Sequence, residues 1–147
     1  MNPNNGANEG MLVRPRPLAD SAAPAGGNLK LSLHNSTRQT LLATNVSVAD
    51  THFSRLIGLL SQKPQWTRED RGLWIIPSRG VHTFGMRFAI DVVFLDRARA
   101  VVCVHENLLP WRISKVVANA RSVIELPVGT IARSRTAIGD RIMLAHT

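Results

Sequence analysis

The residues able to do chemistry gather in one apolar segment of the sequence, VHTFGMRFAIDVVFLD, which spans residues 81–96. His82, Arg87 and Asp91 lie within it, and Glu125 lies in a second apolar segment, SVIELP. A histidine beside a carboxylate is a common pair for general acid–base catalysis, whereas an arginine beside a carboxylate forms a charge-assisted pair. Because these polar side chains occur in strand-like sequence, each must find a partner wherever it is buried.

Strand geometry limits which of these residues can share a site. Side chains alternate between the two faces of a strand, so Thr83, Arg87 and Asp91 share one parity, which holds only locally if the chain bends. Within VHTF, His82 lies on the side of Phe84, which predicts a semi-buried histidine. Residues four apart on a straight strand are about 13 Å apart. His82 and Met86 therefore cannot meet along a straight strand, and neither can Arg87 and Asp91.

A segment of this length exceeds a usual strand, so a bend is expected near Gly85 or Ala89. A joint site requires such a bend, or partners from neighbouring strands. Two interpretations of His82 stay open: a histidine whose hydrogen bonds are satisfied in the core, and a binding or catalytic group.

Catalytic signatures are few in the rest of the chain. The sequence contains no HExxH, GxSxG, CxxC, Walker or GxGxxG motif. Its single cysteine, Cys103, is interpreted as a small buried residue, and one cysteine excludes a multi-cysteine zinc site within the chain. The sequence thus predicts no metal and no cofactor, although a site assembled from distant strands leaves no signature in sequence spacing.

The charge of the chain is strongly basic, with 18 Lys and Arg against 10 Asp and Glu and a formal net charge of +8. Such an excess is typical of proteins with an anionic partner. The basic residues are nevertheless scattered, and no alternation of basic and aromatic residues provides a surface for stacking bases. The pattern indicates a solvated basic surface and argues against nucleic acid as the partner.

Short strand-like segments separated by turn residues make up most of the chain. Asp50 is expected to cap a helix that ends near Leu60, and a short helical turn is expected within residues 131–138. No βαβ rhythm is visible, so the sequence predicts a mainly β fold: a compact β-sandwich or partly open barrel with one short α-helix. The expected strands cover residues 29–35, 40–49, 72–77, 81–96, 100–108, 122–126 and 141–146.

The organisation along the chain is simple. Residues 1–27 are rich in Asn, Pro, Gly and Ala and are expected to form a disordered tail, followed by a single β-rich domain over residues 28–147. No apolar run approaches the roughly 18 residues of a membrane span. No secretion signal is visible, so the cytoplasm is the expected location.

Several motifs resemble, in order, those of the prokaryotic domain of unknown function number 192, also called uncharacterised protein family 0127: RLIGLL, GLWIIP, VHTFGMRFAIDVVFLD, LPW, VIELPVGT and IGDRI. The resemblance covers residues 41–144 and implies a compact β-sandwich-like domain without an assigned reaction. Many members of that family are exported, whereas this chain shows no export signal. The family's Asp-x-x-Gly hairpin turn is Asp96-Arg97-Ala98-Arg99 here, which puts the tightness of that hairpin in question. The signature positions of the family correspond to Arg55, Gly58, Leu59, His82, Thr83, Met86, Arg87, Asp91, Glu125, Pro127, Gly129, Gly139 and Asp140.

The residues and the resemblance together suggest a polar network. In this hypothesis, Arg55 or Arg87 meets Asp91 or Glu125 beside His82, and the network is either a structural staple or the floor of a small pocket. The candidate binding or network residues are Arg55, His82, Thr83, Met86, Arg87, Asp91 and Glu125.

Three functions remain open at this point. The favoured one is a non-enzymatic binding or accessory module for a small polar or anionic ligand. The alternative is a hydrolase-like enzyme that uses His82 with Asp91 or Glu125, which requires these side chains to converge within hydrogen-bond reach in a cleft. Nucleic-acid binding through the basic surface is the second alternative and requires an arginine stripe on one face. The protein partner and the oligomeric state stay open.

Overall fold

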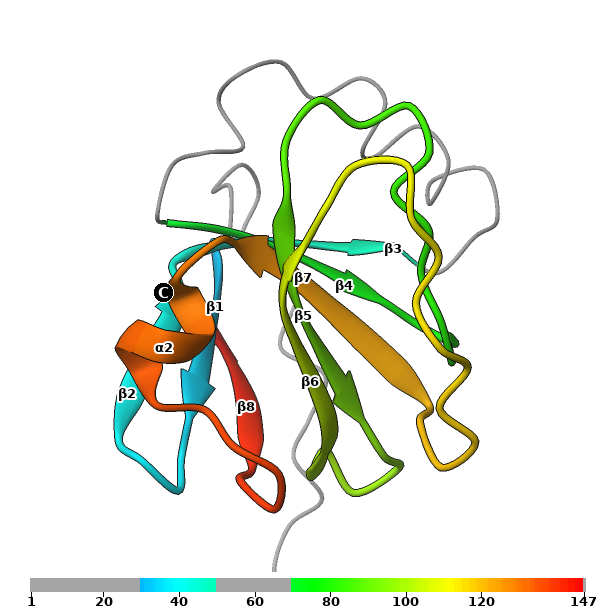
Figure 1. Cartoon of the computed structure of the whole chain (residues 1–147). Coiled ribbons are helices and arrows are strands. Elements are labelled where there is room, and N and C mark those ends of the chain that lie inside the picture. Colours follow the sequence, from blue (N-terminus) through cyan, green and yellow to red (C-terminus); the bar gives the residue numbers. More distant parts are fainter. Residues whose placement is uncertain (1–29, 50–69, 147) are drawn as a thin grey trace, which may run out of the picture.

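The computed structural model describes residues 30–49 and 70–146 of the 147-residue chain. These residues form two β-sheets and a short α-helix (Figure 1), and the prediction of a mainly β fold is confirmed. The tail predicted over residues 1–27 and the helix predicted from Asp50 to Leu60 lie outside the described residues.

The smaller sheet has three antiparallel strands in the order β2-β1-β8. Its strands are β1 (Leu31–Asn35), β2 (Thr40–Ala43) and β8 (Ile142–His146). Helix α2 (Thr130–Ser134) precedes β8 and confirms the helical turn predicted in this region. Within the described part of the chain, no helix is long and apolar enough to cross a membrane.

The larger sheet has five strands in the order β3-β4-β7-β5-β6. The edge strand β3 is parallel to its neighbour β4, and all other neighbouring strands are antiparallel. Strands predicted from apolar runs at β4, β6 and β7 are confirmed. The bounds are β3 (Asn45–Ala49), β4 (Arg71–Ile75), β5 (Ile90–Leu95), β6 (Val101–Leu108) and β7 (Ser122–Pro127).

The single strand predicted over residues 40–49 is wrong, because the chain breaks at Thr44 and passes from one sheet to the other. The N–H groups of Thr44 and Asn45 both donate to the Asp70 carbonyl, at 2.9 and 2.8 Å. This shared acceptor bends the chain, so β2 joins the smaller sheet and β3 the larger one.

The strand predicted over residues 81–96 is shorter than expected. It begins at Ile90, and the preceding residues form a loop that turns at Phe84 and Gly85. Gly85 has a φ of +80°, a conformation that glycine adopts without strain. The expected bend near Gly85 is thus confirmed. Residues 81–84 alternate between the two sides as predicted, but Val81 and Thr83 are the buried residues, and His82 and Phe84 are exposed.

One core cluster fills the space between the two sheets. It contains Leu33 and Leu42 from the smaller sheet and Trp74, Ile124 and Leu126 from the larger one. The sheets approach closely at Gly72 of β4. A Cβ atom there would lie 3.2 Å from the Ala43 Cβ and 3.3 Å from the Leu126 Cδ2, so this contact favours glycine.

A second core cluster covers the other face of the five-stranded sheet. Val92, Phe94 and Val123 come from the sheet, and Val81 and Met86 come from the loop before β5. Both faces of the central strands are therefore buried, as the uniformly buried β5 and β7 show.

The hairpin between β5 and β6 is tight although it lacks the family's glycine. Asp96 Oδ1 accepts the N–H groups of Ala98 and Ala100, at 2.8 and 2.9 Å. Arg99 takes the left-handed conformation itself, with φ +62°, and its guanidinium lies over the Trp74 ring, 5.4 Å from the centroid.

Phe94 provides a test of the second core cluster, since it is 1 % exposed there. Phe94→Ala is expected to lower the free energy of unfolding by about 3–5 kcal/mol, because the substitution leaves a cavity in a close-packed core. Urea unfolding followed by circular dichroism measures the change. Met143→Ala, at a position 54 % exposed, is the control and should change it by less than about 0.5 kcal/mol. A loss below about 1 kcal/mol in Phe94→Ala would contradict this core assignment.

Candidate functional site

Asp91 on β5 is buried, and its carboxylate joins three elements. Oδ1 accepts the N–H of Asn107 at 3.0 Å, and Oδ2 accepts the N–H of Ile131 at 2.9 Å. Ile131 lies in the first turn of α2, whose N-cap, Gly129, offers no side chain to cap the helix. The Asp91 carboxylate, on a strand of the adjacent sheet, accepts the Ile131 N–H in place of a capping side chain. Its contacts thus fasten β5 to β6 and to α2.

Glu125 on β7 faces the opposite side of the same sheet. Directly paired residues share a face, and Glu125 is paired with Leu73 and with Val92, whereas Asp91 is paired with Leu126. Since Glu125 and Leu126 are consecutive on the strand, their side chains point to opposite faces. The sheet therefore separates the two carboxyl groups that the sequence hypothesis placed in one network.

Glu125 is 1 % exposed, and its Oε2 atom has no hydrogen-bond partner among the described residues. Burial in apolar surroundings raises the pKa of this carboxyl group from 4.5 to about 8. In the folded protein Glu125 is therefore protonated and neutral at pH 7. A neutral carboxyl group cannot serve as the base that a hydrolase would need.

His82 is exposed, so the prediction of a semi-buried histidine is wrong. It forms an isolated antiparallel bridge with Ile113. Its ring stacks on that of Phe84, with 5.2 Å between centroids and 27° between planes. Within the described part of the chain, no hydrogen bond joins the His82 ring to Asp91 or Glu125.

Thr83 is fully buried and ties its own loop to the loop that follows β6. Its hydroxyl donates to the Leu109 carbonyl at 2.6 Å and accepts the N–H of Arg112 at 2.9 Å. Its own N–H donates to the Arg112 carbonyl at 2.8 Å, and its carbonyl accepts the N–H of Trp111 at 3.0 Å. These bonds close a turn around Trp111.

Trp111 has an unusual backbone for so large a residue. Its φ is +60°, in the left-handed region that bulky residues rarely occupy, and it is 64 % exposed. The hydrogen bonds from Thr83 hold the turn in this conformation. The tryptophan ring is therefore presented outward.

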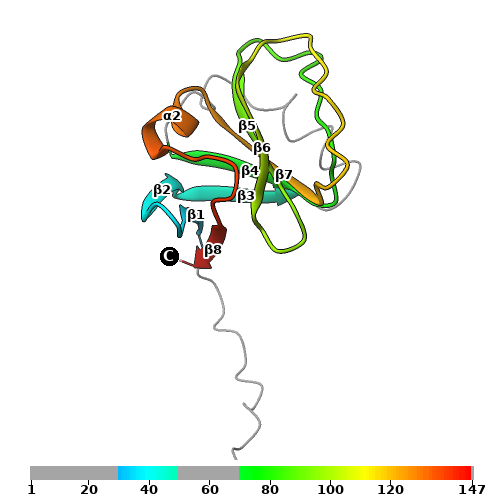
Figure 2. The same cartoon turned by 60° about the horizontal axis from the view of Figure 1, so that its bottom comes forward.

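Two loops, residues 78–88 and 109–121, pair along their length and form what we call the loop lobe. In Figures 1 and 2 these segments run side by side, in green and yellow, and project beyond the five-stranded sheet. The backbone bonds that join them are Ser78 N–H to Arg121 O at 3.0 Å, Val117 N–H to Arg79 O at 2.8 Å and Ser114 N–H to Val81 O at 2.9 Å.

The outer surface of the loop lobe combines aromatic and basic side chains with the exposed aliphatic residues Leu109, Ile113 and Val116. Phe84 follows His82 in the ring row and lies 6.2 Å from Trp111, at a tilt of 40°. The two loops contain no Asp or Glu. Their five basic residues are all exposed, and none forms an ion pair with a described residue: Arg79, Arg87, Arg112, Lys115 and Arg121.

The other candidate residues divide between the lobe and the core. Met86 is buried in the second core cluster and anchors the lobe to the sheet. Arg87 is exposed and makes no ion pair with Asp91 or Glu125. Arg55 lies outside the described residues. The described candidates therefore form no joint network, and four of them, Thr83, His82, Met86 and Arg87, belong to the loop lobe.

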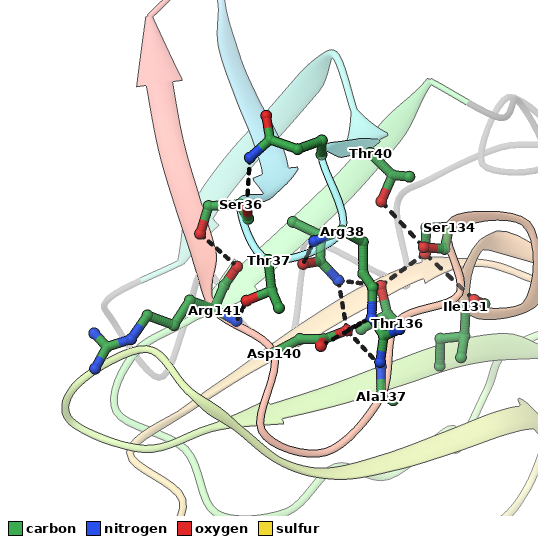
Figure 3. A network of polar contacts seen from close by, with 12 residues as sticks. Ser36, Thr37, Arg38, Thr40, Ile131, Ser134, Thr136, Ala137, Asp140 and Arg141 are labelled. Carbon is green, nitrogen blue, oxygen red and sulfur yellow. Dashed lines mark hydrogen bonds and ion pairs between the residues drawn. The ribbon is translucent and has the colours of Figure 1, made fainter.

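A dense polar cluster surrounds Asp140, remote from these candidates in sequence (Figure 3). Asp140 accepts hydrogen bonds from the Asn35 amide at 2.9 Å, the Ala137 N–H at 2.9 Å and the Arg38 Nε at 3.0 Å. Burial acts to raise the pKa of Asp140, but these hydrogen bonds and the Arg38 charge outweigh it and hold the pKa below 3.8. The cluster fastens the β1–β2 turn to the loop before β8 and is a structural staple.

An open depression between β2 and α2 contains none of the predicted candidates. It is lined by Thr40, Leu41, Leu42, Ala43, Thr44, Asp70, Arg133 and Ser134. Among the residues that the structure describes, no three His, Cys, Asp or Glu side chains gather in a way that could hold a metal ion.

The sequence reasoning did not single out Phe84, Trp111 or Arg112. One signal for them is present in the sequence: residues 71–90 and 107–124 contain no acidic residue, although both stretches contain arginine. The fold pairs the two stretches and so brings their aromatic and basic residues onto one lobe.

Comparisons with known proteins identify the family. The sequence model of DUF192, described as "Uncharacterized ACR", matches residues 33–144. A UPF0127 protein of Thermococcus sibiricus is 35% identical over 116 residues, which cover 75% of this chain and 72% of that protein. A UPF0127 protein of Pyrococcus horikoshii is 34% identical over 113 residues, covering 74% and 94%. The chain therefore belongs to the DUF192 family, as its motifs predicted.

Two solved structures share the fold. A protein of unknown function from Novosphingobium aromaticivorans aligns with a TM-score of 0.65 and 17% identity, over 88% of this chain and 99% of that chain. A putative transcription regulator from Sinorhizobium meliloti aligns with a TM-score of 0.61 and 23% identity, over 77% and 90%.

Glu125 gives a pH-dependent prediction. Its pKa is about 8 in the folded protein and near 4.5 when exposed, so between these values the folded state holds a proton that the unfolded state has lost. The free energy of unfolding should therefore fall as the pH rises from 5 to 8, by at most about 1.4 kcal/mol per pH unit.

The measurement is urea unfolding across this pH range for the unmodified protein and for Glu125→Gln. The variant keeps a neutral side chain of the same shape and should lose this part of the pH dependence. Glu106→Gln, at an exposed position, is the matched control and should behave like the unmodified protein. If Glu125→Gln retains the full dependence, the carboxyl group is ionised in the fold.

Proposed function

We propose that this DUF192 protein is a non-catalytic binding module, and that the loop lobe binds an anionic ligand carrying a flat apolar group. The observation that supports the proposal most directly is the composition of the lobe surface. The row of His82, Phe84 and Trp111 is exposed on two loops that also carry five exposed basic residues and no acidic residue. Aromatic faces attract flat apolar groups, and the basic residues attract negative charge.

The contacts of the buried carboxyl groups favour binding over hydrolysis. Asp91 accepts backbone N–H groups with both oxygens, and Glu125 is held neutral on the other face of the sheet. His82 is stacked on Phe84 rather than bonded to either of them. The described residues therefore offer no histidine–carboxylate pair for the hydrolase alternative.

The construction of the lobe suits a rigid recognition surface. On the inner side of the lobe, Val81 and Met86 pack in the second core cluster. Thr83 ties the two loops to each other through its hydroxyl group. A surface held in this way loses little conformational entropy when a ligand binds. The expectation of a small polar or anionic ligand, or an accessory role, agrees with such a surface.

A fluorescent planar anion tests the proposal. Hydroxypyrene trisulfonate (pyranine) combines one flat ring system with three sulfonate groups, and fluorescence anisotropy measures its binding. Trp111→Ala should weaken binding about tenfold, because stacking on one aromatic side chain contributes about 1–3 kcal/mol. Arg112→Gln should weaken it several-fold.

The matched controls lie outside the lobe. Arg97→Gln, in the β5–β6 turn, removes the same charge, and Met143→Ala removes an exposed apolar side chain. Both should bind pyranine like the unmodified protein. Absence of pyranine binding, or equal binding by Trp111→Ala, would overturn the proposal.

Thr83 gives an independent prediction, because its side chain is buried and cannot touch a ligand. Thr83→Val keeps the shape but removes the hydroxyl, leaving the Leu109 carbonyl and the Arg112 N–H without their partner. Pyranine affinity should fall at least several-fold as the Trp111 turn loosens. Thr83→Ser retains the hydroxyl and should restore most of the affinity. Equal affinity of Thr83→Val and the unmodified protein would show that Thr83 does not position the site.

A further inference from the structure

Resting on the proposed function of the loop lobe, we infer that its anionic partner is an unpaired nucleic acid strand, whose bases stack on the exposed rings while its phosphates meet the basic residues. The sequence argued against nucleic acid because basic and aromatic residues do not alternate along the chain. The fold supplies this alternation across two loops. His82 and Phe84 come from one loop, and Trp111 and Arg112 come from the other.

The rings form an exposed row. The centroids of His82 and Phe84 are 5.2 Å apart, and those of Phe84 and Trp111 are 6.2 Å apart. Phe84 is 43 % exposed and Trp111 64 %. A continuous, exposed row of rings matches the way in which proteins bind single strands, where successive bases stack on aromatic side chains regardless of sequence.

The basic residues follow the length of the lobe. Arg121 and Arg79 lie near its base, where Ser78 bonds to Arg121 and Val117 bonds to Arg79. Lys115 follows Ser114, which bonds to Val81, and Arg112 lies at the Thr83 turn beside the rings. Positive charge is therefore distributed from base to tip. A strand with a phosphate at each nucleotide can contact several of these positions, whereas a mononucleotide presents its charge at one end.

Other anionic polymers match only part of this surface. A duplex hides the faces of its bases within the stack, so the rings would have no base to stack on. The carboxylates of an acidic peptide would pair with the basic residues, but they provide no flat ring to stack on the aromatic side chains. The unpaired strand is the class that uses both features.

The test is fluorescence anisotropy of the full chain with a fluorescein-labelled oligothymidylate of about ten nucleotides, a length within known single-strand site sizes. Binding should weaken with salt, with a slope of log affinity against log salt near −2 for about three phosphate contacts. Trp111→Ala should lower affinity about tenfold and leave the slope unchanged. Arg112→Gln and Lys115→Gln should each reduce the slope by about 0.7, and Arg97→Gln should leave both quantities unchanged.

The competitors decide the identity of the partner. An unlabelled strand should displace the probe, whereas thymidine monophosphate, a duplex of equal length and polyglutamate should displace it at least tenfold less well. Equal displacement by any of these three, or an unchanged affinity in Trp111→Ala, overturns the inference. If pyranine binds the lobe but the oligonucleotide does not, this inference fails and the proposed function stands. If neither probe binds, both fail.

Discussion

Burial of both faces of the central strands in the five-stranded sheet is the constraint on which the rest of the structure depends. β5 and β7 lie inside this sheet, and every residue of both strands is buried. Successive side chains of β5 and β7 enter two different core clusters, so neither face of these two strands is exposed to solvent and a polar residue on either face is costly unless it finds a partner. Asp91 meets this constraint by accepting two backbone N–H groups, and Glu125 meets it by keeping its proton. The same alternation separates the two carboxyl groups and leaves neither facing the other.

Because of this constraint, the recognition surface that we propose lies on the loops and not on the strands. The side chains of the central strands are used for packing or for closing the fold, and the dense cluster around Asp140 holds the smaller sheet to the loop before β8. The loop lobe differs because its two faces have different surroundings. Val81 and Met86 belong to the core beneath it, while the rings and the cations face outward. A rigid scaffold with recognition residues on its loops is a common division of labour in proteins.

The fold was predictable where local sequence decides the structure, and unpredictable where a distant contact does. The apolar runs at β4, β6 and β7 and the turn residues between strands predicted these elements in their places. The break at Thr44 depends on the Asp70 carbonyl, 26 residues later in the chain (70 − 44), and no local pattern reveals it. The position of His82 was missed because the side of Phe84 was taken as the buried one, whereas Val81 and Thr83 face the core and His82 and Phe84 face outward. Motif resemblance singled out Thr83 but gave it no role, because its partners lie in the following loop.

The backbone at Trp111 supports the proposed function of the loop lobe. A turn at φ +60° is easily made by glycine or asparagine, and a bulky residue there costs about 1–2 kcal/mol. If Trp111 stabilised the fold, burial of its ring would offset this cost, yet most of the residue is exposed to water. The chain instead holds the strained turn with the buried Thr83, whose hydroxyl and backbone groups bond to the neighbouring residues. Here buried hydrogen bonds maintain a strained conformation, and burial of the side chain does not offset the strain. This combination is typical of sites that must hold a group in a fixed position. That position lies at the end of the ring row and next to Arg112, which is where a ligand with a flat group and a negative charge would make both of its contacts.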